Sequence, residues 1–284
     1  MRIVAAYKAA DPKFKADETT SEQPQRLVAI SKHFYMGQFE VTQDQYEKVL
    51  GRNPSTFSRR GTGAGNVPAD VDSLRFPVES VSWYDGIEFW NKLSQAENLT
   101  PYYTLTAIIR HSDQSIKSAT VSVASSGRQP RKSSSYRLPT EAEWEWACRA
   151  TTTTPFHFGR VLNGDQANVD GNFPYGTARK GPFLGRITNV GSYLKNSFGL
   201  HDMHGNVLEW CFDVDDPSAY ANRSGTTSDP VVTSGSAKRV LRGGSWYYSS
   251  GDARSASRFS YAPDLRFDNV GFRVVFSSAA VKSP

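Results

Sequence analysis

Apolar and polar residues alternate with two different periods in the first part of the chain. Period-2 alternation in residues 26–42 predicts one or two short early strands, through Val28, Ile30, Phe34 and Met36. After residue 42 the spacing becomes that of an amphipathic helix, with an apolar face of Tyr46, Val49 and Leu50. The segment "GRNPSTF" ends this helix with Gly and Pro.

Three predicted helices begin with the same capping signal. A Ser or Thr stands three residues before a Gln, Asp or Glu, so that each side chain can accept a bond from the backbone N–H of the other residue. The pairs are Thr42 with Gln45, Ser82 with Asp85, and Thr140 with Glu143. The second helix is expected to bury Ile87, Trp90 and Leu93. The third is expected within "RLPTEAEWEWACRA".

Regular patterns are sparse in the rest of the chain. Residues 59–76 are predicted to be a long polar loop, and residues 151–238 short strands joined by ordered loops. A basic, Ser-rich insertion covers about 106–134, where a solvated hairpin is favoured over an RNA or phosphate contact. Near the end, "RVLRGGSW" and "NVGFRVVF" are strand-like and are expected to pair with each other. The pattern favours one irregular α+β domain.

The composition indicates a folded protein with an aromatic-rich core. Of the 284 residues 38% are hydrophobic, 12% aromatic and 21% charged, which argues against disorder. The net charge of +5 is too mild to favour nucleic-acid binding. Only Cys148 and Cys211 are present, which excludes a disulfide scaffold and favours two buried reduced thiols. The short apolar run at the N-terminus predicts no signal peptide or membrane span, so we expect a cytoplasmic protein.

Two spacings in "GLHDMHGNVLEW" bear on metal binding. His201 and His204 are three residues apart, but two ligands on one helix face need a spacing of four, and a turn signal follows. A transition metal is therefore disfavoured. Oxygen ligands fit better, because Ca²⁺ accepts carboxylates together with backbone carbonyls. The candidate calcium ligands are Asp202, Gly205, Val207 and Glu209.

The sequence contains none of the common catalytic or nucleotide-binding motifs. No G-x-S-x-G occurs, no G-x-G-x-x-G follows a predicted strand, and "GTGAG" at 61–65 is not followed by Lys. Glu141, Glu143 and Glu145 could in principle perform acid–base work, but capping and the helix dipole explain them better. The residues alone indicate no catalytic site.

Five segments, in order, resemble the formylglycine-generating enzyme family, also called sulfatase-modifying factors. They are "FYMGQFEVTQDQYEKV", "FPVESVSWYDGIEFWNKLS", "YRLPTEAEWEWACRA", "NSFGLHDMHGNVLEW", and "RVLRGGSW" with "NVGFRVV". The resemblance covers about residues 24–276 and leaves an N-terminal extension at 1–23 and a tail at 277–284. It implies an α+β, C-type-lectin-like fold that is loop-rich with low regular secondary structure.

The resemblance supports some metal sites and removes others. It implies a structural calcium ion at Asp202, Gly205, Val207 and Glu209. The family's second calcium site begins at a position like Ala167-Asn168, but its acidic partner has no counterpart in "KGPFLGRIT". The family's enzymes oxidise a substrate cysteine with copper held by two cysteines, whereas Tyr248 and the stretch "SSGDA" stand in those places here, so no copper is expected. The histidine cluster that binds iron in the related ergothioneine-type sulfoxide synthases is missing too, so no iron is expected.

The chain also resembles variable proteins of diversity-generating retroelements, some of which share this fold. In those proteins a segment between G-G-S-W and G-F-R is rewritten at adenines, between fixed residues. Here Arg254-Ser255-Ala256, Arg258, Pro263-Asp264 and Arg266 fill the fixed positions. Tyr, Ser, Asp, Phe and Leu, which stand between them, are all reachable from an AAC codon by changes at adenine alone. The predicted ligand-binding residues, in the variable-type segment 246–269, are Trp246, Tyr247, Tyr248, Ser249, Asp252, Phe259, Ser260, Tyr261, Leu265, Phe267 and Asp268.

Two functions are therefore considered. The leading one is a non-catalytic scaffold that binds a protein or other macromolecular ligand through this segment, with no membrane or nucleic-acid partner. Tyr and Phe give large contact area with few rotors to freeze, and Ser and Asp add adaptable hydrogen bonds. The alternative is a metal-dependent oxidoreductase of the family with a different ligand set. For the segment itself, the competing interpretation is ordinary aromatic core.

Overall fold

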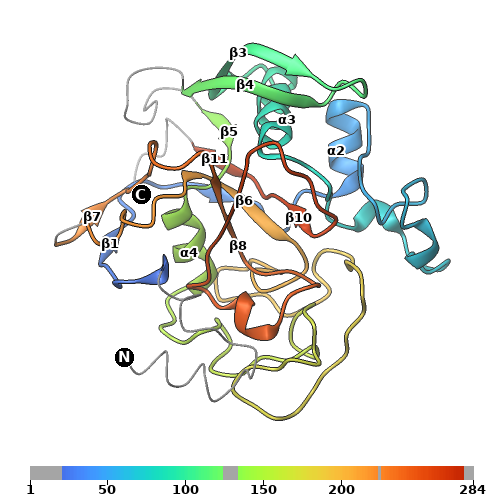
Figure 1. Ribbon diagram of the computed structural model, residues 1–284, viewed down its shortest axis with the longest axis vertical. Helices are drawn as coiled ribbons and strands as arrows, with labels where there is room; N and C mark the ends of the chain where they lie inside the picture. The colour runs from blue at the N-terminus through green and yellow to red at the C-terminus, as the bar shows by residue number, and fades with distance from the viewer. Residues whose placement is uncertain (1–20, 124–133, 223–224, 278–284) are drawn as a thin grey trace.

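Three capped helices form the helical part of the fold. The computed structural model describes residues 21–123, 134–222 and 225–277 (Figure 1). The helices are α2 (Gln43–Leu50), α3 (Trp83–Ala96) and α4 (Glu141–Arg149), and each begins with the predicted capping box. These predictions are confirmed. The sequence could specify them because both partners of a capping box lie within one turn of each other. The apolar faces are also as expected, since Tyr46, Ile87 and Trp90 are buried.

A four-stranded sheet, in the order β10-β6-β8-β9, crosses the middle of the molecule (Figure 1). Its strands are β6 (Leu208–Val214), β8 (Arg239–Arg242), β9 (Phe259–Tyr261) and β10 (Val270–Gly271). β6 pairs parallel with β10 and antiparallel with β8. The expected pairing of "RVLRGGSW" with "NVGFRVVF" is therefore wrong. β6 lies between β8 and β10, and such a non-local pairing is set by tertiary packing rather than by the pattern within either strand.

Three smaller sheets surround this one. A three-stranded sheet has the order β2-β11-β5, and the other two are pairs, β1 with β7 and β3 with β4. The bounds are β1 (Val28–Ala29), β2 (Tyr35–Met36), β3 (Tyr103–Arg110), β4 (Ile116–Val123), β5 (Ser135–Arg137), β7 (Thr227–Ser228) and β11 (Val275–Ser277). The β3–β4 hairpin confirms the hairpin predicted for the basic insertion, whose residues 124–133 lie outside the described part of the chain. Figure 1 shows this hairpin at the top, beside α3.

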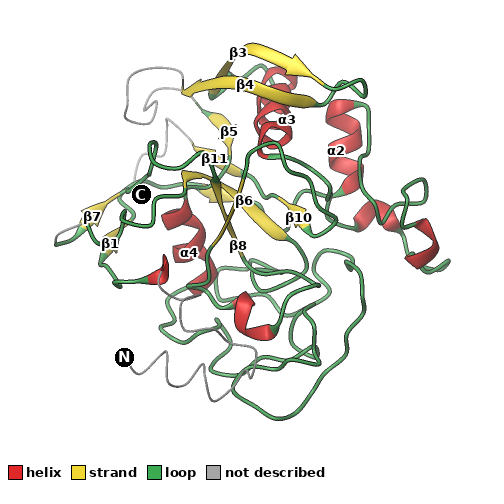
Figure 2. Ribbon diagram, viewed as in Figure 1, coloured by secondary structure: helices red, strands yellow, loops and turns green. Residues whose placement is uncertain are grey.

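Loops make up most of the end of the molecule opposite the hairpin (Figure 2). The segment between α4 and β6 is fully described and contains no named helix or strand. The predicted ordered loops are confirmed there, but the predicted short strands are absent from this segment, where only isolated bridges form. The polar loop at 59–76 holds two short 3-10 turns, η2 (Ala64–Asn66) and η3 (Ser73–Arg75). A third such turn is η4 (Ser250–Ala253). Across the described ranges, each helix is too short or too polar to cross a membrane.

Tryptophan side chains fill the interior. Trp83, Trp90, Trp144 and Trp210 are almost completely buried. Trp83 donates its Nε1–H to the carbonyl of Cys211 at 3.0 Å, which offsets the cost of burying the indole N–H. Cys148 and Cys211 are buried and free, so the prediction of two reduced buried thiols is confirmed.

A buried ion pair ties the last strands to β6. The side chains of Arg273 and Glu209 are both 0% exposed, and Arg273 donates Nε and Nη2 to the Glu209 carboxylate at 2.7 to 3.0 Å. Glu209 also accepts the Nε1–H of Trp144 at 2.7 Å. The remaining Arg273 donors reach backbone carbonyls, including that of Gly37 at 2.9 Å. Because the pair is fully hydrogen-bonded, its desolvation is compensated.

We expect Glu209→Gln to lower the free energy of unfolding by about 3–5 kcal/mol, because it leaves the Arg273 charge buried without a counterion. Urea denaturation measures the change. The matched control is Lys48→Met, which removes an exposed pair with Asp44 on α2 and should change the free energy by less than about 0.5 kcal/mol. A Glu209→Gln loss as small as that of the control would contradict a structural role for the pair.

Candidate binding surface

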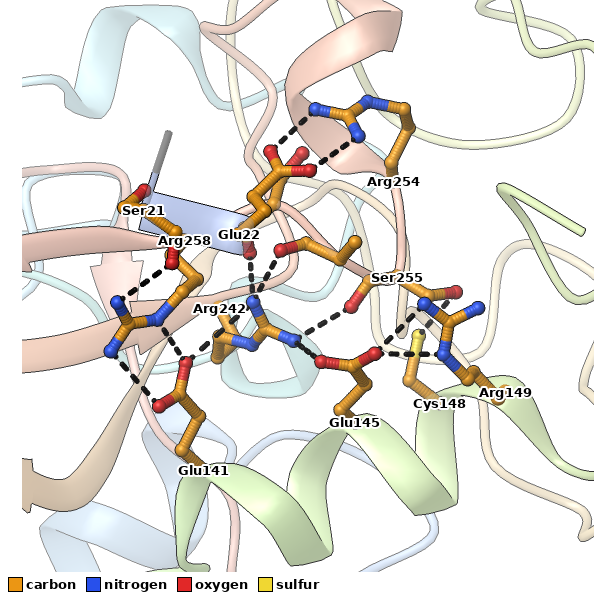
Figure 3. Close-up of polar contacts among 12 residues, drawn as sticks. Ser21, Glu22, Glu141, Glu145, Cys148, Arg149, Arg242, Arg254, Ser255 and Arg258 are labelled. Atoms are coloured by element: carbon orange, nitrogen blue, oxygen red, sulfur yellow. Dashed lines mark hydrogen bonds and ion pairs between the residues drawn. The ribbon is translucent and has the colours of Figure 1, made fainter. Parts of the chain in front are cut away.

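Arginines from the fixed positions of the C-terminal segment are bonded to carboxylates from distant parts of the chain (Figure 3). Arg254 pairs with Glu22 through two bonds, at 2.7 and 2.8 Å, and Arg258 pairs with Glu141 through two bonds, at 2.5 and 3.0 Å. Two-bond pairs fix the plane as well as the position of a guanidinium. Both arginine side chains are almost buried, at 5% and 3% exposure.

Two further arginines complete this set of anchors. Arg266 donates Nε at 2.8 Å to Asp85, in the capping box of α3. Arg242, at the end of β8, bonds Glu145 on α4 and donates to the carbonyls of three consecutive residues, 255–257. Burial alone would raise the pKa of Glu141, but the charges of Arg258 and Arg242 outweigh it and lower that pKa. The carboxylate therefore stays ionised and keeps the anchors charged.

Backbone contacts hold the turn between the anchors. Gly244 has a φ of +73°, and a Cβ there would lie 2.8 Å from the Cα of Ala253, so no other residue fits. The carbonyl of Tyr248 accepts a bond from Asp170 at 2.8 Å, and the carbonyl of Phe267 accepts one from Ser80 at 2.9 Å. Both ends of the segment are thus fastened to neighbouring loops.

Between these anchors, six aromatic side chains follow one another in contact. Ring centroids are 5.5 Å apart for Trp246–Tyr247, 5.8 Å for Tyr247–Tyr248, 4.9 Å for Tyr248–Phe259 and 5.2 Å for Tyr261–Phe267. The hydroxyls of Tyr248 and Tyr261 join the two parts at 2.7 Å. We call this set the aromatic row: Trp246, Tyr247, Tyr248, Phe259, Tyr261 and Phe267.

The predicted ligand-binding residues differ in the fraction of each residue that is exposed to solvent. Tyr247 is 62% exposed, Phe267 42% and Leu265 39%, whereas Trp246 is 8% exposed and packs among buried side chains that include Phe57. The others are partly buried: Tyr248, Ser249, Asp252, Phe259, Ser260, Tyr261 and Asp268. Trp246 therefore supports the row from below, and the rest form or border its outer face.

The structure adds two residues that sequence patterns did not indicate. Phe183, 42% exposed, stacks on Trp246 with ring centroids 6.4 Å apart, so a loop outside the C-terminal segment extends the aromatic row. Glu22 anchors Arg254 from the part of the chain predicted to be a mere extension. Phe183 and Glu22 belong to no motif or periodic pattern in the sequence, so their contacts with the C-terminal segment can be recognised only in the folded structure.

The cysteine thiols and the two histidines of this region are engaged in the interior of the fold. Burial raises the pKa of the Cys148 thiol to about 12 and raises that of Cys211 as well. His204 is bonded to the carbonyl of Ala253 through Nδ1 at 2.7 Å, and burial lowers its pKa to about 3. His201 bonds a different carbonyl, that of Tyr193, at 2.7 Å. The described residues contain no cluster of three or more His, Cys, Asp or Glu that could hold a metal.

The candidate calcium residues do not fit a calcium site in this arrangement. Both oxygens of Glu209 are committed to Arg273 and Trp144, so a cation would have to displace the arginine. One Asp202 oxygen accepts a bond from Gly191 at 2.6 Å, and the other has no hydrogen-bond donor among the described residues. Gly205 and Val207 contribute backbone to this turn, and Gly205 donates its N–H to the carbonyl of Gly243 at 2.8 Å.

A second buried carboxyl lies beside Asp202. Glu40 accepts a bond from Asn206 at 3.1 Å through one oxygen, and its other oxygen lacks a donor. Burial, followed by the charge of Asp202, raises the pKa of Glu40 well above its usual range, and burial raises the pKa of Asp202 too.

Comparison with protein families and curated relatives gives consistent matches. The model of the sulfatase-modifying factor enzyme 1-like domain matches residues 8–278. "Chaperone protein LppX" of Paenibacillus barcinonensis is 34% identical over 196 residues, 63% of this chain and 62% of that protein. Formylglycine-generating enzyme of Streptomyces coelicolor is 39% identical over 146 residues, 48% of this chain and 45% of that protein. The matched region is less than two thirds of the length of either relative.

Among solved structures, Treponema denticola variable protein 1 matches with a TM-score of 0.67 at 29% identity, covering 85% of this chain and 84% of that chain. The match confirms the α+β, loop-rich, C-type-lectin-like fold expected from the resemblance.

We expect Tyr247→Ala and Phe267→Ala to change the free energy of unfolding by less than about 1 kcal/mol, because much of each side chain is exposed. Trp246→Ala should cost about 3–5 kcal/mol, since it empties a buried site. Urea denaturation of the three variants makes the comparison. Similar large losses in all three would identify the aromatic row as core rather than surface.

Millimolar Ca²⁺ or a chelator should leave the thermal midpoint of the protein unchanged, because Glu209 is held by Arg273. Differential scanning calorimetry detects a ligand that binds only the folded state as a rise in that midpoint. A calcium-dependent rise of several degrees would show that Arg273 yields Glu209 to the ion, and would support the calcium site expected from sequence.

Proposed function

This chain belongs to the family of sulfatase-modifying factor enzyme 1-like domains, and we propose that it is a non-catalytic member that binds a protein or other macromolecule through segment 246–269. The observation that carries the proposal is the division of that segment into two sets. Arginines at the fixed positions are bonded to buried carboxylates, whereas the residues between them form the aromatic row at the surface.

The chemistry of the row suits a macromolecular ligand. Exposed aromatic side chains on a rigid support lose little conformational entropy when they bind, and they are the usual energetic centres of protein interfaces. Hydroxyl and carboxylate groups of Ser249, Asp252 and Asp268 border the rings and supply hydrogen-bond partners. Phe183 widens the surface beyond the C-terminal segment.

Similarity to Treponema denticola variable protein 1, whose name describes it as variable, supports a variable-type surface. We propose that the segment is diversified by a retroelement, with replaceable residues at the members of the row after Trp246 and constant residues at Trp246 and the anchors. The geometry explains why such replacement is tolerated: changes at exposed rings cost little stability, whereas loss of one partner of a buried ion pair costs much.

The alternative, a metal-dependent oxidoreductase, is favoured by the 39% identity to formylglycine-generating enzyme of Streptomyces coelicolor. The described segment offers no thiol, because Tyr248 occupies the place that the resemblance gives to the first copper ligand. Cys148 and Cys211 are buried in the interior and kept protonated by that burial. Copper(I) binds thiolates, which hydroxyl groups do not replace.

The DNA around the gene tests the proposal. We expect a nearby copy of codons 246–269 that differs at adenines, beside a reverse-transcriptase gene. The differences should fall at codons of Tyr247, Tyr248, Phe259, Tyr261 and Phe267, and none at those of Trp246, Arg254, Arg258 and Arg266. Differences spread evenly over anchors and row would contradict a diversified surface.

Incubation of the protein with Cu(I) and a sulfatase peptide containing the cysteine motif separates the two functions. We expect no formation of formylglycine by mass spectrometry, with the Streptomyces coelicolor enzyme as the positive control. Turnover that Tyr248→Phe leaves unchanged would establish the alternative and show that copper is held elsewhere.

A further inference from the structure

One arginine near the C-terminus lacks a carboxylate partner. Six arginines lie between residues 239 and 273, and in the described structure five of them have a carboxylate within 4.0 Å: Arg242, Arg254, Arg258, Arg266 and Arg273. Arg239, the first residue of β8, has none. Its Nη1 donates a hydrogen bond to the carbonyl of Phe212 at 2.9 Å. Its guanidinium carbon also lies over the ring of Trp83, 4.0 Å from the ring centroid.

Because Arg239 is partly buried, the absence of a carboxylate partner among the described residues leaves its charge poorly compensated. Arg239 is partly buried, and desolvation lowers the pKa of its guanidinium. Asp213 is the carboxyl whose charge acts on it, but both Asp213 oxygens accept backbone bonds, from Glu141 and Val232 at 2.8 Å. Burial, followed by the charge of Glu141, raises the pKa of Asp213 to about 7, so it does not fully neutralise the arginine. A desolvated cation with free donors is a binding group for an anion.

Arg239 lines a cavity of about 340 Å³, enough for a small organic molecule. The cavity lies between the β3–β4 hairpin and the loop at 231–233, and its walls include the rings of Tyr102, Tyr103 and Phe212. Tyr103 and Phe212 are stacked with centroids 5.6 Å apart. The apolar walls suit a flat hydrocarbon or aromatic body.

The other polar groups of the cavity select an anion rather than a cation. Arg137 also lines it, but two of its nitrogens are taken by Glu143 at 2.7 Å, so it adds no uncompensated charge. Tyr102 is 5% exposed, and its hydroxyl makes no hydrogen bond to the described residues. A hydroxyl donor and an unpaired guanidinium in one apolar cavity match a carboxylate.

We propose that this cavity binds a small organic acid, with its carboxylate on Arg239 and the hydroxyl of Tyr102 and its apolar body against Tyr103 and Phe212. The site goes beyond the proposed binding of a macromolecule, because none of its lining residues belongs to segment 246–269. Failure of one proposal therefore leaves the other unaffected.

The test compares two probes of nearly equal shape, indole-3-acetate and indole-3-acetamide, in titrations followed by saturation-transfer NMR. We expect the wild-type protein to bind the acetate saturably and about tenfold more tightly than the neutral amide. Arg239→Gln should weaken acetate binding about tenfold and remove the difference between the probes. Arg60→Gln removes an exposed arginine with the same change in net charge and should leave both affinities unchanged.

A second variant keeps the test decisive if Arg239→Gln does not fold, which circular dichroism would show. Thr233→Trp places a large ring at an exposed residue of the cavity wall and should abolish binding of both probes. Equal affinity of the two probes, no saturable binding of the acetate to the wild type, or unchanged acetate binding in a folded Arg239→Gln or Thr233→Trp protein would overturn the proposal.

Discussion

The placement of the C-terminal segment depends on arginine–carboxylate pairs that reach across the fold. Their acidic partners lie far apart in the sequence, at Glu22, in the capping box of α3, at the first residue of α4, and on β6. Each pair replaces hydration lost on burial with charge-assisted bonds of defined geometry. The segment has little regular secondary structure, yet these pairs give it fixed positions about every four to eight residues.

Because of these buried pairs, the residues that hold the segment in place differ from those that form its exposed surface. Guanidinium groups pointing inward hold the backbone of the segment, so its most exposed side chains, such as Tyr247 and Phe267, are not needed for that purpose. Rings such as Tyr247 and Phe267 can therefore face outward at modest cost, although exposed aromatic surface is normally minimised. A surface of this kind tolerates replacement residue by residue, which is what a family of variable binding proteins requires.

The same rule explains why Arg239 stands out. Arginines of this region that have a carboxylate partner hold the backbone in place. Arg239, which has none among the described residues, lines a cavity instead. The two candidate recognition sites also differ in chemistry. The aromatic row is bordered by Asp and Ser residues, whereas the cavity presents an uncompensated positive charge between apolar walls. A ligand suited to one has the wrong charge for the other.

The sequence by itself determined the local features. Capping boxes specified the starts of α2, α3 and α4 because both partners lie within four residues, and the ordered motifs specified the family and its loop-rich fold. The resemblance to variable proteins also led to the proposed division of segment 246–269 into fixed and replaceable positions. Only the tertiary structure decided which distant groups meet. It inserted β6 between β8 and β10, paired Glu209 with Arg273, and brought Glu22 and Phe183 to the segment. These contacts join residues tens to hundreds of positions apart, and no periodicity in a single chain encodes such partners.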